Sequence, residues 1–379
     1  MLKKVVIAPD SFKGTMSSIE VCRIIEEGVK KIFPGAETVK VPIADGGEGT
    51  VDAFLAALGG RRVSVRVKGP LFEEVDADYC ILPDGKTAVI EMAAASGLPL
   101  AGDAKNPCLT TTYGTGQLMK DALSQGCTRL IIGIGGSATN DGGIGMAAAL
   151  GVAFTDEEGS EIPLNGGGLE RLRHIDVSGK DRRIDECEVL VACDVDNPLH
   201  GPNGAAYVFG PQKGADEKMV ERLDANLRHY SDVLSGQLGK NIGEIPGTGA
   251  AGGLGAGLVA FANAELKPGI KIVLDAVRFD ELIAGADLVI TGEGKIDGQS
   301  LRGKVPLGVA ERARKQNVPV VAVVGDIGND AEQLYEKGIS AIFSINRVAF
   351  PFKEAKLRCR SDLKAAVEDV MRLIKALRR

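Results

Sequence analysis

The chain has 379 residues, of which 44% are hydrophobic, and a formal net charge of −6. This length is too great for one ordinary core and predicts about two folded domains. The negative charge argues against nucleic acid or an anionic membrane as the main partner. The seven cysteines are scattered, and no C-x-x-C pair occurs, which predicts reduced thiols in a cytoplasmic protein. No apolar run approaches the roughly 18 residues of a membrane helix, and the N-terminus lacks a signal-peptide pattern.

The first 60 residues predict alternating strands and helices. The run "KKVVIAPDS" at 3–11 predicts a buried parallel strand, and Ser17-x-x-Glu20 has the spacing of a capping box that opens a helix. Phe-Pro-Gly at 33–35 ends that helix. A second strand in "TVKVPIADGG" at 38–47 and a helix from about Gly47 to Leu58 follow. This β-α-β-α order is typical of a doubly wound sheet.

The pattern changes after Gly60, where short strands follow one another closely. Close spacing and a Pro-Asp-Gly turn at 83–85 predict antiparallel pairing. Further buried strands are predicted in "TRLIIGIGG" at 128–136 and "CEVLVACDVD" at 187–196. The closely spaced strands are predicted at 61–70, 73–82 and 86–95.

The C-terminal part returns to the first pattern. A glycine-rich stretch at 243–257 predicts a loop that runs into a tightly packed helix, strands follow at 285–294 and 319–326, and one apolar face predicts a final helix over 361–379. The predicted fold is therefore α/β with two domains. Residues 1–60 and 270–379 form a doubly wound Rossmann/flavodoxin-like domain, and residues 61–269 form an inserted mixed α/β domain.

Polar side chains follow nearly every predicted strand. In open α/β sheets, ligands bind beyond the carboxyl ends of the strands. Each of these residues alone fits a cap or a turn, but the set as a whole predicts a ligand site. They are Asp10, Ser11 and Lys13; Asp45 and Glu48; Glu91; Asp194, Asp196 and Asn197; Glu293, Lys295 and Asp297; and Asp326.

The stretch "ADGGEGT" at 44–50 allows two interpretations. Asp45-x-x-Glu48 has the spacing of a capping box, so both acids could simply start a helix. Two carboxylates beside a glycine turn also suit an active site. We expect Glu48 inside the first helical turn, and Asp45 at the edge where ligands bind.

The segment "GIGGSATNDGG" at 133–143 is the strongest candidate for a phosphate site. Its glycines allow backbone N–H groups to face an anion, and a helix that starts near Gly143 would direct its positive end there. The alternative is a glycine-rich turn that satisfies its own backbone. The candidate cofactor-binding residues in this segment are Gly135, Gly136, Ser137, Asn140 and Asp141.

Two acidic segments could hold Mg²⁺. Asp194 and its neighbours offer hard oxygen ligands, although an Asx-turn before Pro198 explains them equally well. Glu293 and Asp297 lie near another strand end, with Lys295 between them. Phosphoryl transfer needs a cation on the transferred group and a carboxylate on the acceptor hydroxyl, and both are present.

A nicotinamide-dependent oxidoreductase is a weaker alternative. The single G-x-G-x-x-G, formed by Gly247, Gly249 and Gly252, follows polar residues rather than a strand, so the dinucleotide fingerprint is misplaced. A protein that binds an organic acid without catalysis is a further alternative. The acidic strand ends and the glycine loop favour an enzyme over both.

Eight segments form a characteristic series along the chain: "APDSFKGTMSS", "PIADGGEGTVDA", "TTYGTGQL", "GIGGSATNDGGIGMAAALG", "CDVDNPL", "GPNGAAYVFGPQKGA", "GTGAAGGLGAGL" and "TGEGKIDGQSLRGKVP". Together they resemble the bacterial type I glycerate kinase family, in order from Lys3 to about Arg372. The resemblance implies an ATP-dependent, Mg²⁺-requiring kinase of D-glycerate, cytoplasmic, with two α/β domains. It implies 2-phosphoglycerate as the usual product, although some members are labelled 3-kinases. A homodimer is a further expectation.

With this family as the frame, each candidate residue receives an expected role. The ATP phosphates lie against the 135–143 loop, with help from Lys295, and Mg²⁺ is held by Asp194, Asp297 or Glu293. Ser11, Glu48 and Arg302 contact the substrate, whose carboxylate pairs with Lys13 or Arg302. Asp45, Asp194 and Lys13 are the expected catalytic residues, and Asp45 or Asp194 orients the acceptor hydroxyl and takes its proton late.

Overall fold

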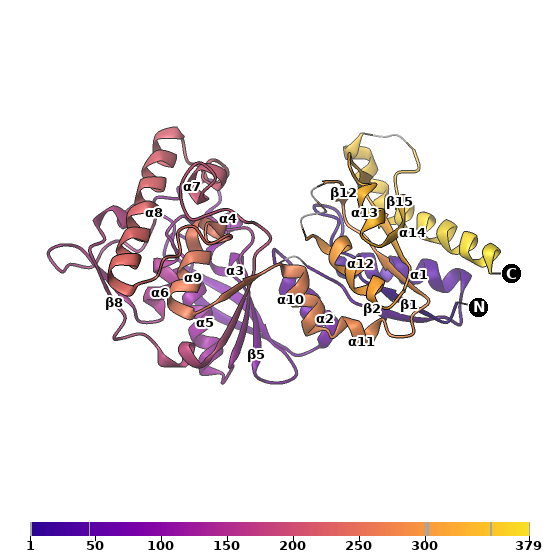
Figure 1. The fold of residues 1–379 in the computed structure, drawn as a ribbon, viewed down its shortest axis with the longest axis horizontal. Helices are drawn as coiled ribbons and strands as arrows, with labels where there is room; N and C mark the ends of the chain where they lie inside the picture. Colours follow the sequence, from indigo (N-terminus) through magenta and orange to yellow (C-terminus); the bar gives the residue numbers. More distant parts are fainter. Residues whose placement is uncertain (1, 45, 299, 301–302, 349–350, 379) are drawn as a thin grey trace. The chain divides into compact units, whose positions relative to one another are not determined.

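The computed structural model describes residues 2–44, 46–298, 300, 303–348 and 351–378. The chain divides into two compact units (Figure 1). Unit 1 consists of Met1–Asp45, Asp52–Gly59 and Ile270–Arg379, and unit 2 consists of Gly46–Val51 and Gly60–Gly269. The assignment of independent domains to residues 1–60 with 270–379 and to 61–269 stays a prediction.

Unit 1 is built on a parallel sheet of five strands. Their order, β15-β13-β11-β1-β2, becomes 2-1-3-4-5 when the five are numbered along the chain, which is the order of flavodoxin-like sheets. The switch point, where the order reverses, lies between β1 and β11. The strands are β1 (Lys4–Ile7), β2 (Glu37–Lys40), β11 (Leu288–Thr291), β13 (Val320–Val324) and β15 (Ile339–Ser344).

Helices cover both faces of this sheet. On one face, α1 (Ser18–Ile32) and α14 (Phe352–Leu377) pack side by side over a core that includes Val321 and Val323 of β13. The side chains that alternate with Val321 and Val323 along β13 point to the opposite face of the sheet. That face is covered by α12 (Val305–Lys315). The unit also contains most of α2 (Thr50–Leu58) and of α10 (Gly269–Ala276), together with α11 (Phe279–Leu282), β12 (Lys295–Ile296), β14 (Asp326–Ile327) and α13 (Gln333–Glu336).

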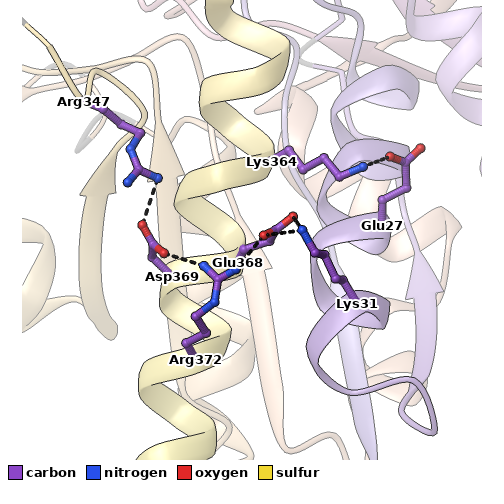
Figure 2. Close-up of polar contacts among 7 residues, drawn as sticks. All are labelled: Glu27, Lys31, Arg347, Lys364, Glu368, Asp369 and Arg372. Carbon is purple, nitrogen blue, oxygen red and sulfur yellow. Dashed lines mark hydrogen bonds and ion pairs between the residues drawn. The ribbon is translucent and has the colours of Figure 1, made fainter.

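Local signals set the bounds of α1, and ion pairs link it to α14. Ser17 accepts a hydrogen bond from the Glu20 N–H at 3.3 Å, so the predicted N-cap is confirmed. Glu368 of α14 pairs with Lys31 of α1 at 2.9 Å and with Arg372 of its own helix at 2.8 Å (Figure 2). Solvent exposure of both cations keeps each such pair near 1 kcal/mol or less, so apolar packing carries most of this contact.

Unit 2 contains a mixed sheet of six strands in the order β10-β9-β6-β5-β4-β3. The predicted antiparallel pairing of the strands after Gly60 is confirmed, because β3 pairs with β4 and β4 with β5 in that sense. The remaining neighbours are parallel. The strands are β3 (Arg61–Lys68), β4 (Glu74–Ile81), β5 (Thr87–Glu91), β6 (Arg129–Gly133), β9 (Glu188–Ala192) and β10 (Glu265–Lys267).

The helices of unit 2 bury two large apolar clusters and one small one. One large cluster lies between the sheet and α5 (Tyr113–Ser124), and the second large cluster surrounds α8 (Glu217–Leu238) and α9 (Leu254–Ala262). The other elements are α3 (Ala93–Ser96), α4 (Leu98–Ala101), α6 (Ile144–Ala149), β7 (Ala153–Thr155), β8 (His174–Asp176) and α7 (Ala205–Phe209), with 3₁₀ helices at Gly168–Arg171, Arg182–Glu186, Pro211–Lys213 and Ala250–Gly253.

The glycine-rich stretch at 243–257 leads into α9, as predicted. A Cβ at Gly252 would lie 1.9 Å from the Thr139 carbonyl oxygen, so this residue must be glycine for two loops to pack. The glycines of the misplaced dinucleotide fingerprint therefore serve packing within unit 2. Among the described residues, no helix combines the length and the apolar run needed to cross a bilayer.

Two helix bounds differ from the prediction. The helix expected from Gly47 begins at Thr50, and the final helix begins at Phe352 rather than at 361. The early start of α14 was missed because Phe352 and Leu357 are 71% and 83% exposed and interrupt the apolar stripe.

Candidate active site

The structure gathers the predicted site residues into two groups, each within one unit. Unit 1 brings Ser11, Lys13, Glu293 and Lys295 to one pocket. Unit 2 places the 135–141 loop, Glu48 and Asp194 near the carboxyl edge of its sheet. Asp45 and Arg302 lie outside the described residues.

The pocket of unit 1 has a volume of about 580 Å³ and lies at the carboxyl edge of the parallel sheet. Its walls include residues that follow β1, β11, β13 and β15, so it spans the switch point between β1 and β11. Ligands of doubly wound sheets bind at this position. Residues that the sequence presented as separate strand ends therefore share one cavity.

Glu293 is the most enclosed acid of this pocket. It is 5% exposed, and its Oε1 accepts a hydrogen bond of 2.5 Å from the Ser300 hydroxyl. The Lys304 Nζ lies 4.0 Å from its other oxygen. These contacts fix the carboxylate in place, with a cation beside it.

A short ladder positions Lys295 beside the pocket. β12 and β14 pair in parallel, and the Asp326 N–H donates to the Gly294 carbonyl at 3.0 Å. The Lys295 Nζ lies 3.7 Å from the Asp297 carboxylate, and its side chain is exposed. The loops after β11 and β13 thus support each other and hold Lys295 at the pocket.

Several side chains of the pocket were not singled out from the sequence, and Lys304, Phe352 and Lys356 are among them. Lys304 lies just before α12, and Phe352 and Lys356 lie in the first turns of α14. No local pattern marks them, because only the parallel order of the sheet brings α14 to the ends of β1 and β11. Asp10 and Asp326 also line the pocket, and the strand-end rule had found both.

In unit 2, the segment 46–51 lies on the carboxyl edge of β5, β6 and β9. The Gly46 carbonyl accepts the Gly135 N–H at 3.3 Å, and the Val51 N–H donates to Glu91 Oε1 at 2.7 Å. A Cβ at Gly46 would come within 2.5 Å of the Ala192 Cβ. The segment therefore packs directly over the ends of three strands.

The prediction that Glu48 starts a helix is wrong. Gly46 and Gly49 have φ values of +89° and +88°, a left-handed conformation that no α-helix contains. The helix consequently begins at Thr50, whose hydroxyl donates to the Gly47 carbonyl at 2.7 Å. Glu48 is exposed in the preceding turn, so it is not the N3 residue of a capping box.

Asp141 is fully buried within the candidate phosphate loop. Its carboxylate accepts the N–H of Thr112 at 2.8 Å, of Gly143 at 3.0 Å and of Gly145 at 3.3 Å, and also the Thr112 hydroxyl at 2.8 Å. Burial raises the pKa of this carboxyl, while these bonds oppose the rise. Asp141 thus binds backbone N–H groups at the start of α5 and of α6. These N–H groups are consequently not free to bind a phosphate.

Lys213 forms hydrogen bonds to the same loop, and the sequence analysis did not identify it. Its side chain is buried, and its Nζ donates hydrogen bonds of 2.7 Å to the Ser137 Oγ and to the Thr139 carbonyl. Burial lowers the pKa of Lys213 to about 7, although the charge of Asp141 acts in the opposite direction. The one available signal was its place in "GPNGAAYVFGPQKGA", a segment of the family resemblance.

Asn140 belongs to the same loop, and its side chain is fully buried. Neither of its amide atoms has a hydrogen-bond partner among the described residues, and the same holds for the buried Tyr230 hydroxyl. A buried amide without a partner is uncommon and destabilises a fold by about 1–3 kcal/mol. The loop therefore contains polar groups that its own fold does not explain.

Asp194 is exposed just beyond the end of β9. Its Oδ1 accepts the Gly269 N–H at 2.8 Å, at the first residue of α10. This contact gives Asp194 a structural contribution, since it binds one of the free N–H groups at the start of a helix. Its exposure leaves the carboxylate accessible to a substrate as well.

The acids of both groups fit Mg²⁺ that arrives with a nucleotide. The part of the chain that the structure describes holds no cluster of three or more potential ligands among His, Cys, Asp and Glu. Mg²⁺ commonly binds through one or two carboxylates together with phosphate oxygens and water, rather than in a protein cage. Glu293, fixed by Ser300, and the exposed Asp194 are carboxylates that would suit such binding.

Comparisons with known proteins agree over nearly the whole chain. A family model described as "Glycerate kinase family" matches residues 5–375. The chain is 51% identical to "Glycerate kinase" of Bacillus subtilis over 373 residues, which cover 98% of each chain. It is 53% identical to "Glycerate 2-kinase" of Escherichia coli over 343 residues, 90% of each chain. A crystal structure from Salmonella typhimurium LT2, provisionally named glycerate kinase 2, superposes with a TM-score of 0.90 and 46% identity over 100% of both chains.

Proposed function

Because the chain belongs to the glycerate kinase family, we propose that it transfers the γ-phosphoryl group of ATP to D-glycerate in the presence of Mg²⁺, with 2-phosphoglycerate as the product. The family makes the protein a kinase. The name of the Escherichia coli relative supports the 2-hydroxyl as acceptor. The observation that carries the proposal is the single pocket that joins Lys13, Glu293 and Lys295 from separate strand ends.

Phosphoryl transfer depends mainly on positioning and on stabilising negative charge. Lys13 and Lys295, both exposed at the pocket, neutralise anionic oxygens of the substrates. Glu293, with Asp194 and Asp297 as alternatives, would hold Mg²⁺. When bound, this ion neutralises charge on the phosphate oxygens.

A carboxylate on the acceptor orients its hydroxyl and takes its proton late in the reaction. Asp194 suits this role because it is exposed at the carboxyl edge of a parallel strand, while its other contact fixes its position. Asp45 is the alternative. Ser11 lines the pocket of unit 1 and could contact the substrate there, and Arg302 remains a candidate for its carboxylate.

The roles expected for the 135–143 loop need adjustment. Asp141 is fully buried and its oxygens are occupied, so it acts on bound substrates only through the shape of the loop. Gly135 and Gly136 are more accessible than Ser137, Asn140 and Asp141. Direct contact between this loop and a ligand therefore involves its first residues.

Phosphorus NMR of the product tests the reaction and the acceptor hydroxyl together. The full-length protein is incubated with ATP, Mg²⁺ and D-glycerate, with L-glycerate and no acid as controls. We expect a new phosphomonoester signal split into a doublet, because the 2-phosphate is attached to a carbon with one hydrogen. A triplet would assign the 3-hydroxyl instead, and ATP that persists unchanged would contradict the kinase proposal.

A further inference from the structure

Lys213 is a buried lysine to which the proposed reaction assigns no role. It is only 1% exposed, and lysine is almost never buried this deeply without an acidic partner. Its Nζ donates hydrogen bonds of 2.7 Å to the Ser137 Oγ and to the Thr139 carbonyl. Both acceptors are neutral, and the charge of Asp141 acts on the amine only at longer range. Stability alone therefore does not explain why a lysine occupies this position.

The bond from Lys213 determines where the hydroxyl hydrogen of Ser137 points. A serine hydroxyl has one hydrogen and two lone pairs, and the lysine occupies one of these lone pairs. The hydrogen must therefore point away from the Lys213 Nζ. Among the described residues, no atom accepts a hydrogen bond from this hydroxyl. Lys213 thus leaves Ser137 as a donor that is available to a ligand.

Two backbone donors accompany this hydroxyl at the end of the loop. Gly136 is exposed with a φ of +76°, and Ser137 retains 9% exposure. The Gly136 carbonyl accepts the Leu98 N–H at 2.8 Å. The Ala138 N–H donates to the Ser96 carbonyl at 3.0 Å, so the backbone is fixed on both sides. Within the described part of the chain, the N–H groups of Gly136 and Ser137 have no acceptor, and successive N–H groups in such a turn bind anions.

We propose that Lys213 is a positioning residue of the phosphoryl-transfer reaction, which directs the Ser137 hydroxyl, beside the N–H groups of Gly136 and Ser137, toward an anionic oxygen of a bound substrate. The proposal rests on the proposed function for the identity of the substrates. All three groups at the end of the loop are donors, so their ligand is an acceptor, and a negative charge strengthens such bonds. The carboxylate of D-glycerate and the phosphates of ATP share this chemistry. Lys213 itself is buried beneath the loop and acts on the substrate only through Ser137.

A double-mutant cycle in the full-length protein tests this role. Initial rates of Lys213→Met, Ser137→Ala and the double variant are measured against D-glycerate and against ATP with Mg²⁺. We expect both single substitutions to raise the KM of the same substrate about tenfold or more, because a hydrogen bond to a charged group is lost or misdirected. The effect on kcat should be smaller. The double variant should be little worse than Ser137→Ala, since Lys213 acts through that hydroxyl.

The substrate whose KM rises identifies the anion as the carboxylate or the phosphate. Lys218→Met alters an exposed lysine of α8 and is the matched control, which should keep both KM values of the wild type. Urea unfolding checks that each variant is folded under the assay conditions, and Ser137→Ala tests the hydroxyl while it keeps the buried lysine. Losses that multiply in the double variant, or wild-type KM values for both substrates in Ser137→Ala, would overturn the proposal.

Calorimetric titration repeats the cycle without catalysis. D-glycerate and a non-hydrolysable ATP analogue with Mg²⁺ are titrated separately, and the Kd of the substrate identified by the rates should rise by a similar factor in both single variants. Phosphorus NMR shows separately whether D-glycerate is phosphorylated. A wrong reaction and a wrong role for Lys213 therefore give different results.

Discussion

Lys213 donates a hydrogen bond of 2.7 Å to the Ser137 hydroxyl, and this contact joins two buried side chains that are 76 positions apart in the sequence. The second bond of Lys213, to the Thr139 carbonyl, fixes the backbone of the same loop. The lysine thus defines the shape of a segment that the family resemblance marks as functional. Its burial lowers its pKa, which makes the stability of the fold depend on pH.

Lys213 should make the stability of the protein rise between pH 7 and pH 9. Its ordinary pKa of 10.5 applies in the unfolded chain, and burial lowers the pKa to about 7 in the fold. Between these values the unfolded chain binds more protons, so the free energy of unfolding increases with pH. Below pH 7 Lys213 is charged in both the folded and the unfolded protein, so the buried charge destabilises the fold by its full amount. Urea unfolding of the wild type and Lys213→Met should show a difference that grows by about 2 kcal/mol across this interval in favour of the wild type.

Lys218→Met is the control for this measurement, because Lys218 is exposed on the nearby α8. Its stability should follow the wild type at every pH. If the free energies of unfolding of Lys213→Met and the wild type changed in parallel with pH, burial would not lower the pKa of Lys213.

Asp141 should be essential for the stability of unit 2. Asp141→Ala removes the acceptor of three backbone N–H groups and leaves them buried without a partner. We expect the free energy of unfolding to fall by about 3 kcal/mol or more. Asp76→Ala, at a side chain 75% exposed, should change it by less than about 0.5 kcal/mol. Equal effects of the two substitutions in urea unfolding would contradict the structural role of Asp141.

Local patterns predicted the elements well and the contacts between them poorly. Local sequence patterns sufficed for α1 and the parallel strands. The N-cap bond of Ser17 spans three residues, and each strand coincides with a short β-branched run. Lys213 contacts Ser137 only in the folded protein, because the two residues are far apart in the sequence. No local pattern in the sequence predicts this contact.

The strand-end rule succeeded for a related reason. Parallel strands place their carboxyl ends on one edge, so Lys13, Glu293 and Lys295 could be grouped before the strand order was known. Phe352 and Lys356 come from the start of a helix, where no such rule applies. Glu48 was misplaced because the spacing of a capping box says nothing of the left-handed glycines beside it.

The two acids of "ADGGEGT" should differ in their effect on turnover. Asp45→Asn should lower kcat strongly, because Asp45 is a candidate for the residue that orients the acceptor hydroxyl. Glu48→Gln should change the free energy of unfolding by less than about 0.5 kcal/mol, since Glu48 is exposed and precedes the helix. Initial rates and urea unfolding of both variants check this. A loss of more than about 1 kcal/mol in Glu48→Gln would restore the capping interpretation.

Asp194→Asn should separate the structural and catalytic contributions of Asp194. The asparagine keeps a carbonyl oxygen that can accept the Gly269 N–H, so the melting temperature should stay close to that of the wild type. It cannot take a proton from the acceptor hydroxyl, so kcat should fall about 100-fold or more. Asp196→Asn, at a neighbouring exposed carboxylate, is the matched control and should retain most of its activity. Near-wild-type turnover in Asp194→Asn would leave Asp45 as the remaining candidate for this role, and a large fall in melting temperature would mean that the helix contact requires the full negative charge.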